Sequence, residues 1–150
     1  MKNKNMPKTT TKAKYFLAKT DPETFSIDDF AKEKITYWDG VHSHQAINCI
    51  KQWKIGDFVL IYHSMGKAKI VGLSKVVTDP HKDLKDVRDI SWAADLELIK
   101  VFEESKQVSL KEIKETQLFN DFSLVRQSRL SVMACTEDFI TWLKSKNVLE

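Results

Sequence analysis

Hydrophobic and polar positions along the chain fall into short apolar runs typical of strands and wider spacings typical of helices. Apolar runs predict strands at 14–20, 58–63, 68–77 and 92–102. The run at 58–63 is almost entirely apolar, so we expect this strand to be buried on both faces. A hairpin loop at 65–67 should join it to the next strand, in which Gly72 indicates a bulge or a close backbone approach.

Hydroxyl residues followed by carboxylates mark helix starts, because the side chain at an N-cap accepts from an otherwise unpaired helix N–H. Such signals begin at Ser26, Ser109 and Thr136. A further helix is expected at about 43–53, which places Trp38 in a turn between the first two helices. The segment 124–132 is interpreted as a loop leading into a short strand.

The order of these elements is too irregular for a doubly wound sheet. It runs strand, two helices, hairpin, strand, helix, strand, helix. We therefore predict an α+β domain with one small mixed sheet or partial barrel and helices packed around it. A chain of 150 residues that is 42% apolar suffices for one such domain with a sizeable core.

Charge is distributed unevenly along the chain. The first 14 residues hold five lysines and no acid, whereas the remainder carries 19 Lys and Arg against 21 Asp and Glu, a balance of about −2. We expect residues 1–13 to form a disordered basic tail, and the ordered domain to span 14–150. Such a tail either raises affinity for a polyanion or only improves solubility.

Targeting and cysteine patterns indicate a soluble protein that is not secreted. No apolar run approaches the roughly 20 residues needed to cross a bilayer, and the lysine-rich start lacks the apolar core of a secretory signal. Cys49 and Cys135 are far apart and are expected to be free core thiols. We expect the protein in the cytoplasm of a bacterium or the nucleus of a eukaryote, with no membrane partner.

Candidate catalytic and metal-binding groups are sparse. The chain has no Gly-x-Ser-x-Gly elbow and no glycine-rich phosphate loop. His42 and His44 form a His-x-His pair, but a zinc site needs three or four converging ligands. We expect no catalytic residue, no metal and no cofactor. An enzyme would need an acid–base pair, for which Asp39 with His42 or His63 is the candidate.

An aromatic pocket is better supported by these residues. Trp38 precedes Asp39 and Gly40, and glycine lets backbone approach a ligand closely. An indole can stack on a flat heteroaromatic base, worth about 1–3 kcal/mol, while polar groups read its edge. The alternative, that Trp38 and Tyr62 are core residues and Lys19 is solvated, stays open at this point.

Six motifs in order resemble one family of domains. They are YFLAKTDP at 15–22, FSIDD at 25–29, WDGV at 38–41 followed by QA and N at 45–48, GD at 56–57 with YHS at 62–64, VG at 71–72, and RQSRLSV at 126–132. These resemble the EVE domain family over about residues 14–147. The resemblance implies a PUA-like fold, in which a curved mixed sheet closes toward a barrel flanked by helices.

The same resemblance implies a non-catalytic, monomeric module that binds DNA or RNA and captures a modified base, above all modified cytosine, in an aromatic-walled pocket. Trp38 would be the stacking wall and Asp39 would accept from an exocyclic amine, while Arg126 either lies near the mouth or forms a structural ion pair. The residues implied for the site are Lys19, Asp21, Trp38, Asp39, Gly40, Val41, His42, Asn48, Tyr62, His63, Ser64, Arg126, Arg129 and Ser131. A nuclease or base-processing enzyme on the same scaffold and a sensor of free nucleosides are the alternatives.

The chain departs from the family pattern directly after WDGV. The family usually has RNYQAR, whereas this chain has HSHQAI at 42–47. Arginine offers a planar, permanent charge to phosphate, and neutral histidine does not. We therefore expect affinity for a nucleic-acid backbone to be weaker, pH-sensitive or altered in specificity.

Overall fold

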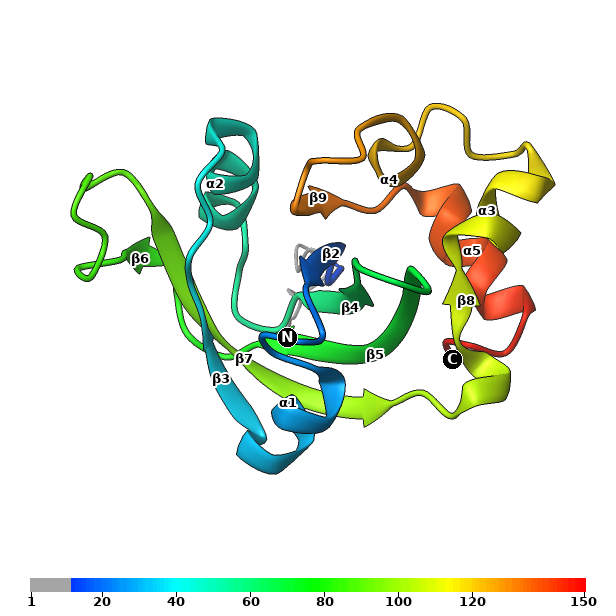
Figure 1. Ribbon diagram of the computed structural model, residues 1–150, viewed down its shortest axis with the longest axis horizontal. Helices are drawn as coiled ribbons and strands as arrows, with labels where there is room; N and C mark the ends of the chain where they lie inside the picture. The colour runs from blue at the N-terminus through cyan, green and yellow to red at the C-terminus, as the bar shows by residue number, and fades with distance from the viewer. Residues whose placement is uncertain (1–11) are drawn as a thin grey trace, which may run out of the picture.

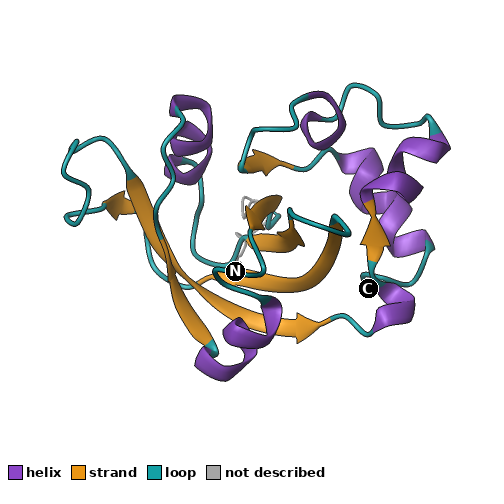
Figure 2. Ribbon diagram, in the orientation of Figure 1, coloured by secondary structure: helices purple, strands orange, loops and turns teal. Residues whose placement is uncertain are grey.

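The computed structural model describes residues 12–150, so the expected tail lies almost wholly outside the described residues. One mixed sheet runs through the domain in the order β3-β7-β5-β4-β2-β9, with β6 added to β7 and β8 added to β5 (Figures 1 and 2). Its strands are β2 (Tyr15–Thr20), β3 (Ile35–Trp38), β4 (Phe58–His63), β5 (Lys69–Val76), β6 (His81–Lys82), β7 (Trp92–Val101), β8 (Val108–Ser109) and β9 (Val132–Ala134).

The sheet is curved and open. β2 and β4 pair in parallel, and the remaining pairs are antiparallel. Among the described residues no pairing joins β3 to β9, so the curvature seen in Figure 1 does not close a barrel. The predicted α+β class with a curved mixed sheet is confirmed.

Helices cover the sheet from several sides. They are α1 (Ile27–Glu33), α2 (His44–Lys51), the 3-10 helix η2 (Glu104–Lys106), α3 (Leu110–Thr116), α4 (Ser123–Arg126) and α5 (Glu137–Ser145). Figure 1 shows α3, α4 and α5 gathered at one end of the domain, with α1 and α2 elsewhere around the sheet. No helix within residues 12–150 has the length and apolar character needed to cross a membrane.

Helix α1 begins where the sequence predicts. Ser26 Oγ accepts from the Asp29 backbone N at 3.1 Å, and the Asp29 carboxylate accepts from the Ser26 N at 2.9 Å. This capping box satisfies two amides that the first turn leaves unpaired. The cap sets the direction in which α1 leaves β2.

One predicted element is wrong and another is wrong in part. Trp38 does not lie in a turn: it ends β3, paired with Ala94 of β7. A four-residue strand is too short for alternation to identify, and its pairing partner is more than fifty residues away in sequence. The loop leading into a short strand, predicted for 124–132, is present as 127–131 and β9, but its first three residues belong to α4, a single turn whose Leu124 is buried against the core.

The predictions for β4 and Gly72 are confirmed. Val59, Leu60, Ile61 and Tyr62 are each at most 3% exposed, so β4 is buried on both faces. The register with β5 shifts between Ile61 and Tyr62, and a Cβ at Gly72 would lie 2.6 Å from Ile27 Cδ1. The missing side chain therefore lets the start of α1 pack directly on the sheet, next to the C-terminal end of β2.

Candidate functional site

A cavity of about 450 Å³ lies beside the C-terminal ends of β2 and β3. This volume falls within the roughly 300–1,000 Å³ of ligand pockets. The two strands are at separate places in the sheet order, and the β2–α1 connection bridges the space between them. The lining residues are Lys19, Thr20, Thr24, Phe25, Glu33, Thr36, Tyr37, Trp38, Asp39, Gly40, Val41 and Ser131.

Phe25 and Trp38 together form one apolar wall of this cavity. Thr36 and Trp38 lie two residues apart on β3 and so share one face of the strand. The rings of Trp38 and Phe25 meet edge to face, with centroids 6.3 Å apart and planes at 78°. Trp38 is 7% exposed and belongs to the hydrophobic core, so one indole both packs the fold and lines the cavity.

The segment after β3 forms the open rim. Gly40 has φ +75°, a left-handed conformation that glycine adopts readily, and no heavy atom lies within 4 Å of where its Cβ would be. Asp39 Oδ2 lies 3.1 Å from Lys85 Nζ, and this ammonium also sits 4.8 Å from the centre of the Tyr37 ring. A carboxylate and bare backbone are therefore presented side by side at the rim.

Lys19 brings a positive charge to the cavity from β2. Its Nζ donates to the Ser128 carbonyl at 3.0 Å and lies 5.5 Å from the centre of the Tyr62 ring. Burial lowers the pKa of Lys19 from its ordinary value. The Lys19 backbone N donates to the Ser131 carbonyl at 2.8 Å. This bond holds Ser131, the residue before β9, beside the cavity. One bond to a carbonyl leaves two ammonium donors for a ligand.

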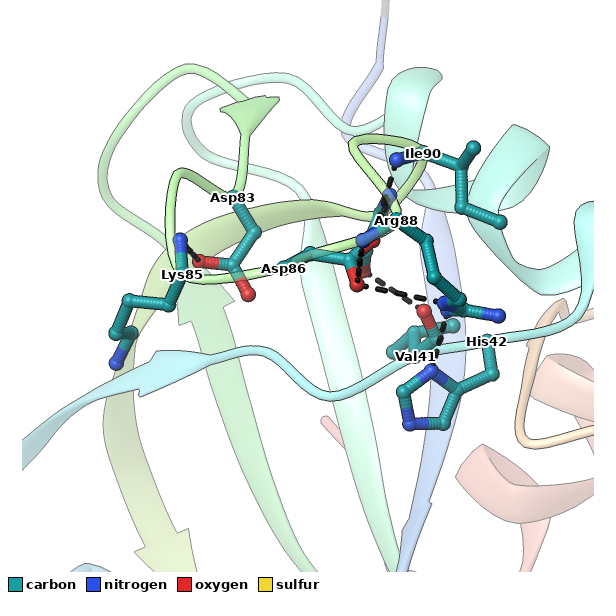
Figure 3. Close-up of polar contacts among 8 residues, drawn as sticks. Val41, His42, Asp83, Lys85, Asp86, Arg88 and Ile90 are labelled. Carbon is teal, nitrogen blue, oxygen red and sulfur yellow. Dashed lines mark hydrogen bonds and ion pairs between the residues drawn. The ribbon is translucent and has the colours of Figure 1, made fainter.

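The segment 83–91, here called the bracing loop, holds the rim from outside (Figure 3). The Asp86 carboxylate accepts from the backbone N–H groups of Ile90 and Ser91 at 3.1 and 2.8 Å. These bonds hold the pKa of Asp86 at about 2. Ser91 Oγ donates to the Val41 carbonyl at 2.7 Å, so an ordered loop is tied to the cavity rim.

Arg88 extends this contact to the residue beyond Val41. Its guanidinium meets Nδ1 of His42, and its Nε lies 3.4 Å from Asp86 Oδ1 (Figure 3). His42 thus lies on the outer side of the rim and does not line the cavity. The bracing loop was expected only as a polar connection. Its available signal was an Asx turn, in which Asp83 and Asp86 each accept from the backbone N–H two residues later.

Six of the fourteen residues implied for the site line the cavity, and Tyr62 lies directly under one of them. Those six are Lys19, Trp38, Asp39, Gly40, Val41 and Ser131. Tyr62 is buried in β4, opposite Lys19 in the β2–β4 register. The sequence analysis did not assign Phe25 to the site, although it opens the matching FSIDD motif.

Three of the remaining residues serve local structure. Asp21 Oδ1 accepts from the Glu23 N at 2.9 Å and shapes the turn after β2. His63 Nε2 accepts from the Ile27 N at 3.0 Å, at the start of α1. Ser64 Oγ donates to the Thr20 carbonyl at 3.3 Å.

The last three residues are exposed and do not line the cavity. Asn48 is exposed on α2, and Arg126 and Arg129 are exposed at and after the end of α4. Arg126 Nη1 lies 4.0 Å from Asp121 Oδ1, and both side chains are well exposed, so this ion pair is weak.

Asp39, His42 and His63, the candidates for an acid–base pair, each contact another group. Asp39 faces Lys85, His42 contacts Arg88, and the His63 imidazole is bonded to the α1 backbone. Within residues 12–150 no three side chains of His, Cys, Asp or Glu gather as metal ligands would. What the cavity does offer is an apolar wall, an ammonium, a carboxylate and open backbone.

Known proteins resemble this chain in sequence and in fold. A sequence model described as "EVE domain" matches residues 14–145. Thymocyte nuclear protein 1 of Rattus norvegicus is 28% identical, aligned over 97% of this chain and 81% of its own. A crystal structure from Agrobacterium tumefaciens is 32% identical with a TM-score of 0.78, covering 89% of this chain and 93% of that one.

The human protein has the same fold at lower identity. The structure of human thymocyte nuclear protein 1 in complex with DNA containing 5-methylcytosine superposes with a TM-score of 0.78 at 22% identity, covering 89% of this chain and 98% of that one. The family model spans most of the chain and includes every residue that lines the cavity. This chain therefore belongs to the EVE domain family.

Proposed function

We propose that this protein binds DNA carrying a modified cytosine and holds the unstacked base in the cavity beside Trp38. The observation that carries the proposal is the meeting of an indole, an ammonium, a carboxylate and open glycine backbone at one cavity. The complex of human thymocyte nuclear protein 1 with DNA containing 5-methylcytosine, on the same fold, supports the choice of ligand.

The energetics of base capture fit the groups present. Flipping a base from a duplex costs a few kcal/mol, which stacking worth about 1–3 kcal/mol per base partly offsets. Cytosine offers an exocyclic amine as a donor, and the Asp39 carboxylate is an acceptor at the rim. A methyl group packed on Phe25 and Trp38 would add about 0.8 kcal/mol of apolar burial.

Lys19 adds charge where the nucleotide would enter. Its ammonium is half-buried against the Tyr62 ring and keeps two donors for a carbonyl or phosphate oxygen. A half-buried ammonium interacts with an anion more strongly than a fully solvated one, because less water screens it. Phosphate contact from Lys19 would hold the nucleotide while the base enters.

The proposal is tested by titrating the protein with matched oligonucleotides that carry plain cytosine or 5-methylcytosine. Trp38→Leu leaves an apolar side chain in the core, although one smaller than the indole, and removes the stacking surface. We expect tighter binding of the methylated probe by the wild type, and a loss of about 5- to 150-fold for Trp38→Leu. Asp39→Asn should weaken binding with little effect on folding, since this side chain is 38% exposed.

Trp142→Leu is the matched control, because Trp142 is half-buried against Phe119 and Phe139 and lines no part of the cavity. It should lower thermal stability and leave affinity unchanged. Equal affinity of the folded wild type and Trp38→Leu for every probe would reject the cavity as the base site. The same titration with RNA and free nucleosides assigns the ligand class, and turnover of any probe would favour an enzyme.

A further inference from the structure

A second hollow, of about 830 Å³, lies between the β4–β5 hairpin and α3. Hairpin residues 66–69 form one wall, and Ser109 with the exposed side of α3 forms the other. Its charged lining residues are Lys67, Lys69, Lys111, Lys114 and Glu115, and its remaining lining residues are Gly66, Ala68, Ser109, Leu110 and Gln117. We call this hollow the lysine groove.

The lysines of this groove form no ion pair with a described carboxylate. Across residues 12–150, no carboxylate lies within 4.0 Å of any of these four ammonium groups. Glu112, the other acid of α3, pairs at 2.7 Å with Lys146, the residue that follows α5. Four lysines against the single acid Glu115 give the groove a positive field that attracts anions.

The register of the sheet shows how close one edge of this groove lies to the cavity beside Trp38. Thr20, which lines the cavity, pairs with His63 of β4, and His63 pairs with Lys69, which lines the groove. Neighbouring strands are about 4.8 Å apart, so Thr20 and Lys69 are about 10 Å apart along the sheet end. A DNA strand rises about 3.4 Å per nucleotide, so this separation corresponds to about three nucleotides.

We propose that the lysine groove binds the phosphodiester backbone of the same DNA strand, about three nucleotides from the captured base. The inference rests on the proposed function for its occupant, and the groove's charge and position are its own support. Phosphate contacts fix register and orientation but carry no sequence information. The groove therefore strengthens binding of methylated and plain DNA alike, while discrimination stays with the cavity.

The salt dependence of DNA binding by the full chain tests whether the groove supplies phosphate contacts while the cavity discriminates between bases. The variant Lys111→Gln/Lys114→Gln removes two ammonium groups from the exposed side of α3. Loss of two phosphate contacts should make the slope of log K against log salt concentration shallower by about 1.8. The wild type would then lose about tenfold more affinity than the variant between about 50 and 200 mM salt. The preference for the methylated over the plain duplex should stay unchanged.

Three further variants test whether a change in salt dependence is specific to the charges of the groove. Lys54→Gln/Lys100→Gln removes two exposed lysines that line neither hollow and should keep the wild-type slope. Lys111→Arg/Lys114→Arg keeps the charge and should also keep it. Glu115→Gln removes the only acid of the groove and should strengthen binding of both probes.

The outcomes separate the two proposals. A wild-type slope in Lys111→Gln/Lys114→Gln, or an equal change in the Lys54→Gln/Lys100→Gln control, overturns the lysine groove. Equal binding of methylated and plain duplexes by the wild type overturns the base site, while the slope comparison still decides the groove. If the protein shows no salt-dependent binding to any DNA, the assignment of the groove to DNA is overturned. Binding only to vesicles of phosphatidylcholine and phosphatidylserine has the same consequence.

Discussion

Trp38 serves two purposes at once. Its indole packs edge to face on Phe25 within the core, and it also lines the cavity at the end of β3. A residue that does both couples folding to binding, because truncating a buried aromatic costs about 3–5 kcal/mol of stability. Variants that keep a sizeable apolar side chain, such as Trp38→Leu, separate the two effects better than alanine does.

His63 makes folding stability depend on pH. Its Nε2 accepts from the Ile27 N–H, which requires the neutral imidazole, and burial together with the Lys69 charge lowers its pKa against the opposing effect of Asp28. The unfolded chain therefore takes up the proton first as pH falls. The stability from neutral His63 is fully present above its ordinary pKa of 6.5, and is lost as pH falls through the lower folded pKa.

Urea unfolding at about pH 8 and about pH 5 checks this. We expect the wild type to lose more stability on acidification than His63→Gln, whose amide oxygen can accept the same bond without titrating. Parallel losses in the two proteins would show that His63 does not control this window.

A side chain at position 72 is expected to clash with its neighbours. A Cβ there would lie 2.6 Å from Ile27 Cδ1 and 2.9 Å from the Lys100 carbonyl oxygen. Gly72→Ala should therefore lower the free energy of unfolding by about 1–3 kcal/mol, measured by chemical denaturation. Ile27→Val removes the nearer atom, so the double variant should be more stable than the sum of the single effects predicts. Strict additivity would contradict the contact.

At the scale of elements, the bracing loop holds the rim through Asp86. The carboxylate collects the N–H groups of Ile90 and Ser91, and Ser91 in turn bonds the Val41 carbonyl. Asp86→Ala should release the loop and speed amide hydrogen exchange at Ile90, Ser91 and the rim segment 40–42. Asp79→Ala, an exposed acid in the same connection, should leave exchange at these sites unchanged. Unchanged exchange in Asp86→Ala would show that the loop does not brace the rim.

At the scale of the whole molecule, the core shields the thiols. Burial raises the pKa of Cys49 to about 12, and it also raises the pKa of Cys135. Reaction with a thiol reagent requires the thiolate, so Cys49 should react at neutral pH only when the domain opens. Alkylation followed by mass spectrometry, with and without denaturant, measures this. Fast labelling of Cys49 in the folded protein would show that the helix carrying it opens locally.

Much of the architecture follows from short-range signals in the chain. The apolar run at β4, the hydroxyl caps at Ser26 and Ser109, and the glycine at position 72 each specify local structure through burial, capping or space. The matching motifs also identified the family and six of the residues that line the cavity. Each of these features leaves a mark in a short stretch of sequence, as an apolar run, a hydroxyl residue before a helix or an isolated glycine, although the close approach at Gly72 involves Ile27 and Lys100 from elsewhere in the chain.

Other features depend on partners far away in sequence. Trp38 lies in a strand because β7 pairs with it, and its environment includes Phe25 from the β2–α1 connection. The contact between Arg88 and His42, and the bond from Ser91 to Val41, join segments about 46 and 50 residues apart. The periodicity of a single segment carries no information about such contacts, because they arise only when the sheet brings its ends together. The sequence motifs thus identified Trp38 as a candidate site residue. Only the folded sheet shows that Trp38 both packs in the core and lines the cavity.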